Sequence, residues 1–164
     1  NYIVAHGETY APADSLKLVE TTSWTQRELE FAKFGQRRKV AHFCLTPAGS
    51  ILFSRPVSAP DWKNNELREY SLTGKWLRTI HLNGIQETPL NMKISPDGEQ
   101  IVFDLGRRRI YVAKIDGSDV REVSTIGCAA DWSPDQKALV FDDSSSSHIV
   151  RNGIFILNLS LDLK

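Results

Sequence analysis

The chain has 164 residues and a formal net charge of zero, with 20 basic and 20 acidic side chains. This balance gives no electrostatic attraction to nucleic acid or to an anionic membrane surface, so we expect neither as a partner. No stretch approaches the roughly 18 apolar residues that membrane insertion requires, and the length suits one domain with its own core. Asn1 opens the sequence with neither an initiator Met nor a signal-peptide pattern, so we expect a processed product, a fragment or part of a longer protein.

Residues 1–38 carry the weakest pattern in the chain. Apolar runs at 2–5 and 16–19 predict two strands with a turn at 11–14 between them. The stretch that follows is ambiguous. Thr25 to Glu28 have capping-box spacing, which favours a short helix ending near Phe34. The alternative is an outer strand near residues 29–32, and because the rest of the chain repeats as strands, the strand is the preferred prediction.

Beyond residue 39 a pattern of strands recurs. A turn containing proline precedes a short β-branched or aromatic strand three times, at 45–53, 94–103 and 132–141, and the last two copies lie 38 positions apart. A third strand follows in the first two copies and is closed by a tight turn at Gly74 or Gly117. Four strands in about 40 residues are typical of a propeller blade. The sequence therefore predicts an all-β chain that forms a β-propeller or partial propeller of about three to four four-stranded antiparallel blades.

The expected blades cover residues 1–38 (degenerate), 39–87, 88–127 and 128–164, within one partial propeller. Complete propellers close a ring of about 4–8 blades, which leaves only short, protected edges. An arc of three to four blades would expose a sheet face and strand edges at both ends, and such surfaces invite association. We expect either the remainder of a longer chain or another protein to complete the ring, ahead of a second copy that would make a homo-oligomer.

The residues Ser95-Pro96-Asp97-Gly98, followed by strands at 101–103 and 110–112 and the turn Asp116-Gly117-Ser118, resemble the PD40 (WD40-like) repeat. This repeat builds TolB-type propellers and the propeller domains of prolyl-oligopeptidase-like peptidases. The likeness continues at 132–135 and weakens in the first copy, where Ala48 replaces the aspartate. It implies a scaffold that binds proteins or gates a catalytic domain. Only the resemblance favours a periplasmic or other extracytoplasmic location.

No motif in the chain predicts catalysis. There is no G-x-S-x-G, H-E-x-x-H, P-loop or G-x-G-x-x-G pattern. Cys44 and Cys128 are not in a C-x-x-C pair and are expected to be small core residues, and the four His are scattered. We therefore expect no catalytic residues, metal or cofactor, and predict a non-catalytic scaffold that mediates protein–protein interaction. The alternative is a propeller fragment of a larger enzyme that gates or supports a catalytic site elsewhere.

Two charged residues occupy the same position in adjacent innermost strands. Lys93 and Asp131 each stand just ahead of the proline turn of their blade. Equivalent positions of neighbouring blades lie side by side, so we expect these side chains either to pair across the inter-blade seam or to line the channel.

Two further groups are candidates for binding a partner. Asp104 and Asp142 end equivalent second strands, and the loops after them carry Arg107 and Arg108 in one case and Asp143 in the other. A basic loop beside an acidic loop would form a charge-complementary rim, although solvated hairpin loops would carry the same residues.

Trp62 lies at the tip of the long loop in the first complete blade. A tryptophan at such a place either anchors a protein partner or folds back onto its own blade.

Overall fold

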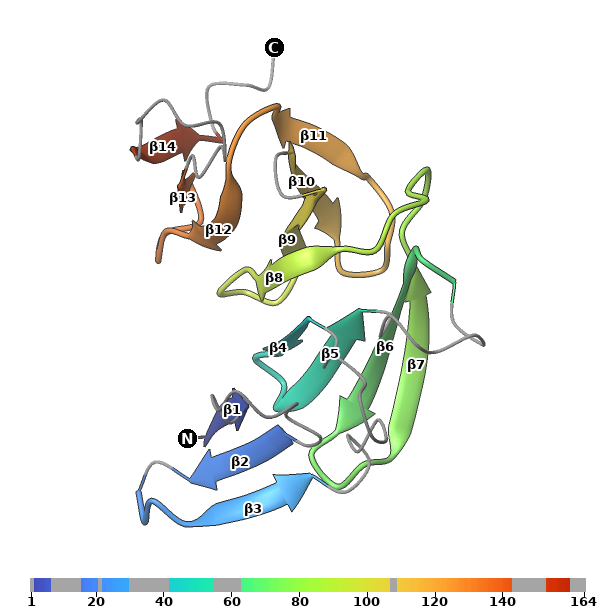
Figure 1. The fold of residues 1–164 in the computed structure, drawn as a ribbon, viewed down its shortest axis with the longest axis vertical. Coiled ribbons are helices and arrows are strands. Elements are labelled where there is room, and N and C mark those ends of the chain that lie inside the picture. The colour runs from blue at the N-terminus through green and yellow to red at the C-terminus, as the bar shows by residue number, and fades with distance from the viewer. Residues whose placement is uncertain are drawn as a thin grey trace.

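The computed structural model describes residues 2–6, 16–20, 22–29, 42–54, 63–106, 109–142 and 153–159. Every regular element in these ranges is a β-strand, and the strands form four antiparallel sheets (Figure 1). No helix within the described ranges is long and apolar enough to cross a membrane.

Each sheet is a simple meander of strands in chain order, named here as a blade. Blade 1 contains β1 (Tyr2–His6), β2 (Leu16–Glu20) and β3 (Gln26–Leu29). Blade 2 contains β4 (Phe43–Leu45), β5 (Ser50–Ser54), β6 (Glu66–Ser71) and β7 (Trp76–His81). Blade 3 contains β8 (Leu90–Ile94), β9 (Gln100–Leu105), β10 (Arg109–Lys114) and β11 (Arg121–Ser124). Blade 4 contains β12 (Cys128–Trp132), β13 (Ala138–Asp142) and β14 (Ile154–Asn158).

The ambiguous segment near residue 26 is a strand. β3 pairs antiparallel with β2, with Val19 opposite Gln26 and Leu16 opposite Leu29. The helix that the capping-box spacing favoured is therefore wrong over 26–29, because pairing with β2 prevails over the local signal. Residues 30–34 lie outside the described ranges.

The four blades follow one another in an arc, with the first strand of each blade toward the concave side (Figure 1). β8 packs against β4 on one side and against β12 on the other, so the innermost strands of blades 2, 3 and 4 are neighbours. This arrangement is a partial β-propeller, and it confirms the predicted all-β fold class.

Blade 3 is buried on both faces because successive side chains of a strand point in opposite directions. Ile101, Phe103 and Leu105 of β9 belong to the core shared with blade 2. Val102, between them, belongs to the core shared with blade 4, together with Ile110 of β10. This two-sided burial explains why successive residues at the centre of β9, Ile101-Val102-Phe103, are all apolar and do not alternate with polar ones.

Candidate functional site

Lys93 and Asp131 form the ion pair expected across the seam between blades 3 and 4. Lys93 Nζ lies 3.6 Å from Asp131 Oδ2, and each side chain is about half exposed. An ion pair this open to water contributes little to stability. The pair lies on the two innermost strands, and its two formal charges cancel.

Cys44 occupies the matching position of blade 2 and is buried. Burial raises the pKa of its thiol to about 12, against a smaller lowering by the charge of Lys93 and a further raising by Glu69. The thiol is therefore protonated and unreactive in the folded protein at neutral pH. Cys128 is only half-buried, and its Sγ donates a hydrogen bond of 3.1 Å to Asp142 Oδ1.

The aspartates that end the second strands have a structural role that the sequence analysis missed. Asp104 is 1% exposed, and its Oδ2 accepts a hydrogen bond of 3.2 Å from Asn91 Nδ2. Ser54 lies at the same position of blade 2, and its hydroxyl donates a hydrogen bond of 3.3 Å to the carbonyl oxygen of His42. In each of these blades the end of the second strand is thus tied to the start of the first. Asp104 is not displayed on the rim as expected, because its carboxylate is buried.

The tie in blade 3, between Asp104 and Asn91, lies beside an irregularity of the innermost strand that recurs in blade 4. The register of β8 against β9 shifts between Leu90 and Lys93, and that of β12 against β13 shifts between Cys128 and Asp131. The first of the two residues inside each shift, Asn91 or Ala129, has a positive φ. A polar group at the end of the neighbouring strand satisfies the backbone or side chain at such a bulge.

The remaining rim and loop candidates, Trp62, Arg107, Arg108 and Asp143, lie outside the described residues. The neighbouring Arg109 is described, and its Nη2 donates to Glu87 Oε1 at 2.7 Å.

The proline turns of successive blades meet along the seams. Asp97 accepts hydrogen bonds from Ser95 Oγ at 2.6 Å and from the Glu99 amide at 2.9 Å within its own turn. In the orientation that satisfies both groups, the amide nitrogen of Gln136, from the turn of blade 4, lies 3.1 and 2.6 Å from the two carboxylate oxygens of Asp97. The aspartate of the repeat therefore closes its own turn and also receives a donor from the following blade.

A tight turn of blade 3 docks against the end of blade 2. Gly117 has a φ of +88°, and a Cβ placed on it would lie 2.1 Å from the carbonyl oxygen of His81. The amide of Asn83 donates to the Gly117 carbonyl at 3.1 Å. Glycine is required here for two reasons, the positive φ and the close approach of two backbones.

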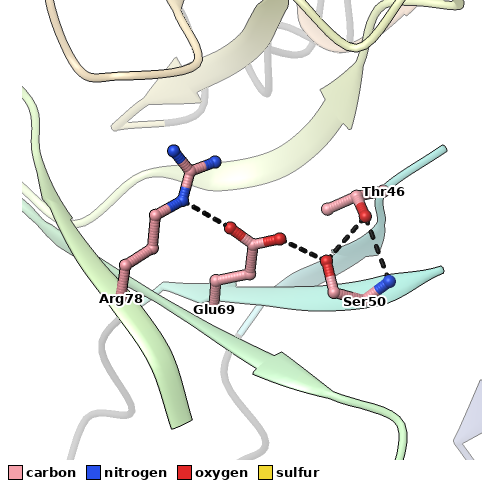
Figure 2. A network of polar contacts seen from close by, with 4 residues as sticks. All are labelled: Thr46, Ser50, Glu69 and Arg78. Atoms are coloured by element: carbon pink, nitrogen blue, oxygen red, sulfur yellow. Dashed lines mark hydrogen bonds and ion pairs between the residues drawn. The ribbon is translucent and has the colours of Figure 1, made fainter. Parts of the chain in front are cut away.

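Blade 2 departs from the repeat at its proline turn, where Ala48 replaces the aspartate, and a different polar network occupies the place (Figure 2). The hydroxyls of Thr46 and Ser50 lie 2.6 Å apart, and Ser50 Oγ donates to the buried carboxylate of Glu69. Arg78 Nε donates to the other carboxylate oxygen of Glu69 at 2.6 Å. The network holds an acidic side chain within the seam with blade 3.

The most informative surface is the face of blade 4 that points away from blade 3. Because Val140 pairs with Ile156, and Asp142 with Ile154, these side chains share one face of the sheet. Val140 is 40% exposed, Ile154 81% and Ile156 78%. We call these three residues the open face.

The same positions in blade 3 are covered. Val102 pairs with Val112, and Asp104 with Ile110, which places Val102, Ile110 and Val112 at the positions of Val140, Ile154 and Ile156. All three residues of blade 3 are at most 1% exposed, because blade 4 packs on them. An exposed sheet face at each end of the arc was predicted without its residues, and aligning Ile154-Phe155-Ile156 with Ile110-Tyr111-Val112 would have named two of them.

Within the described ranges, no group of three or more His, Cys, Asp or Glu side chains is placed to hold a metal ion.

Comparison of the sequence with models of protein families gives no match, and comparison with curated proteins gives none either. Comparison of the structure gives a likeness to the crystal structure of TolB from Acinetobacter baumannii, with a TM-score of 0.63 and 17% sequence identity. The aligned region covers 97% of this chain and 38% of that chain. At this identity the likeness shows a TolB-like propeller fold. The chain therefore spans well under half the length of the protein that it matches.

Proposed function

We propose that this chain is a non-catalytic propeller scaffold that works through contact with other polypeptide. The observation that supports it is the open face of Val140, Ile154 and Ile156, which is apolar and exposed at positions where blade 3 is buried. Contiguous apolar surface on a folded protein marks a site of association, because covering it removes that surface from water.

The polar residues near the concave side support the same conclusion. Asp104 and Asp97 hold strands and turns of the propeller together, and the Lys93–Asp131 pair is internally neutral. Each of these groups has a structural partner within the chain. The TolB-like fold supports a role as a scaffold for protein interaction and does not identify a partner.

The experiment compares the chain with the double variant Ile154→Lys/Ile156→Lys, which places a lysine opposite Asp142, and with the control Ile126→Lys. Ile126 is also exposed, at 46%, but it lies in the connection between β11 and β12 and is not one of the residues of the open face. Binding of a fluorescent apolar dye and the solution mass by light scattering are measured across a range of protein concentrations.

We expect the double variant to bind less dye and to associate less than the chain itself, with no loss of thermal stability, while Ile126→Lys changes none of these. Charges on a solvent-facing surface add no desolvation cost, so a folded variant is expected. A marked loss of stability in the double variant would show that the face is already covered by the chain itself, which contradicts the proposal.

A further inference from the structure

We propose that the open face of blade 4 is the docking surface for a further propeller blade, contributed by polypeptide outside residues 1–164. The inference rests on the proposed function and names the kind of partner that the surface fits. Its basis is the seam between blades 3 and 4, which covers the equivalent face of blade 3 and shows what that cover is made of.

The cover of blade 3 is a sheet with apolar and aromatic side chains. Ala130 and Trp132 of β12, with Leu139 and Phe141 of β13, pack on Val102, Ile110 and Val112. The open face has valine and isoleucine at the same three positions, so the same type of cover fits it. A sheet that matches it buries side chains that are now 40–81% exposed.

Two polar contacts accompany the apolar cover and specify how the covering blade is oriented. Trp132 Nε1 donates to the Lys93 carbonyl at 3.1 Å, and the Gln136 amide reaches Asp97. Thirty-eight positions further along, the equivalent acceptors are the carbonyl of Asp131 and the carboxylate of Asp135. The partner blade is therefore expected to present an indole N–H to the first and an amide donor to the second.

Blade 4 of a second copy of this chain cannot offer the cover that the structure shows. The apolar face of its own β12 and β13 is already packed against its own blade 3. The occupant that the surface specifies is thus an additional blade of this type.

The test appends a second copy of residues 125–164 after Lys164, since the apolar face of that segment already packs on Val102, Ile110 and Val112. Ile156→Cys is introduced in the original blade 4, and its rate of modification by a thiol reagent is followed by peptide mapping, which separates it from Cys128. The control extension carries Leu139→Asp and Phe141→Asp in the added copy only.

We expect modification at position 156 to slow by about tenfold or more in the extended chain, as for a site reached only by local opening, and to be unchanged in the control extension. Trp132→Phe in the added copy, which removes the indole donor, should restore part of the rate. An added blade that stays sensitive to protease and leaves position 156 fully reactive overturns the inference.

Two other outcomes separate this inference from the proposed function. Protection of position 156 in a dimer of the chain without an extension would make a second copy the occupant, which overturns the inference and leaves a role in association standing. Protection of position 156 in a monomer of that chain would overturn both.

Discussion

Blades 3 and 4 have the same pattern and opposite surroundings. Ile110 of blade 3 is fully buried, whereas Ile154, the same residue type at the same position of blade 4, is 81% exposed. Their backbone pairing is the same, since each lies opposite the aspartate that ends the second strand. The difference arises because one blade has a neighbour within this chain and the other presents its face to solvent.

The comparison shows that the face of a blade that points toward the next blade is buried only where that next blade covers it. In a repeat protein, stability is approximately the sum of the repeats and of the interfaces between neighbours. Substitutions at equivalent positions should therefore differ in their cost to stability mainly because one position lies in a seam between blades and the other does not. This can be tested one residue at a time.

The largest contrast is expected between Ile110→Ala and Ile154→Ala. Truncating the buried Ile110 removes apolar contacts and leaves a cavity, which should lower the free energy of unfolding by about 3–4 kcal/mol. Truncating the exposed Ile154 should change it by less than about 0.5 kcal/mol. Urea denaturation followed by tryptophan fluorescence measures both. Equal losses would mean that Ile154 is covered in solution, and the difference between the blades would disappear.

The next contrast lies in the seam between blades 2 and 3, at Gly117. Gly117→Ala places a Cβ against the carbonyl of His81 and forces an L side chain to a φ of +88°, which should cost about 3 kcal/mol. Gly49→Ala is the matched control, because its φ is +79° and no atom lies within 4 Å of the new Cβ; its cost should be about 1 kcal/mol. Similar melting temperatures for the two variants would show that the docked turn does not hold this seam.

A smaller contrast concerns which type of residue occupies the same position on the covered faces of blades 2 and 3. Glu69, which pairs with Leu52, occupies the position that Val112 occupies in blade 3. Arg78→Ala removes the cation beside this buried carboxylate (Figure 2) and should cost about 2 kcal/mol, less than a fully buried pair because Arg78 is itself half exposed.

Adding Glu69→Val to Arg78→Ala should restore stability to within about 1 kcal/mol of the original chain, because the apolar residue recreates the filling of blade 3. The hydroxyl of Ser50 loses Glu69 as its acceptor in this variant, but Thr46 Oγ1, which lies 2.6 Å away in the original chain, is left in place as a partner. A double variant as unstable as Arg78→Ala alone would show that the loss does not come from the buried charge of Glu69.

The sequence was sufficient to predict the fold class, because the spacing of proline turns and short strands is a local pattern that the chain repeats. It also placed Lys93 and Asp131 together, since residues at one repeat position lie side by side in adjacent blades. The burial of Asp104 could not be predicted in the same way. In the sequence, an aspartate at the end of a strand resembles a loop residue. It is buried only because of the bulge at Asn91 and the cover from blade 4.

The open face illustrates a second limit. Val140, Ile154 and Ile156 follow the same pattern as core residues, so hydrophobicity alone predicts that they are buried. Their exposure depends on whether a neighbouring blade is present, which is not a property of the residues themselves. The contacts across the proline turns are also non-local, because Gln136 and Asp97 belong to different blades.

The smallest effect distinguishes Asp97 from Asp135, which occupy the same position in blades 3 and 4. Hydrogen bonds from Ser95 and the Glu99 amide lower the pKa of Asp97, with a further contribution from Gln136 across the seam. Hydrogen bonds from Ser133 and the Lys137 amide lower the pKa of Asp135 within its own turn. Because the pKa of each is lower in the folded state, the stabilisation is present above the ordinary aspartate pKa of about 3.9 and is lost as the pH falls through the lowered value.

Asp97→Asn and Asp135→Asn should therefore each flatten the loss of stability below about pH 4, measured as the urea midpoint between about pH 2 and 7. Asp97→Asn should also lower the midpoint at neutral pH more than Asp135→Asn does, since it weakens a contact between blades as well as a turn. Gln136→Ala provides the control, because in its background the two asparagine variants should become equivalent. If they already behave alike with Gln136 present, the contact between the turns contributes nothing to the seam, which is then held by its apolar side chains together with the hydrogen bond from Trp132 to Lys93.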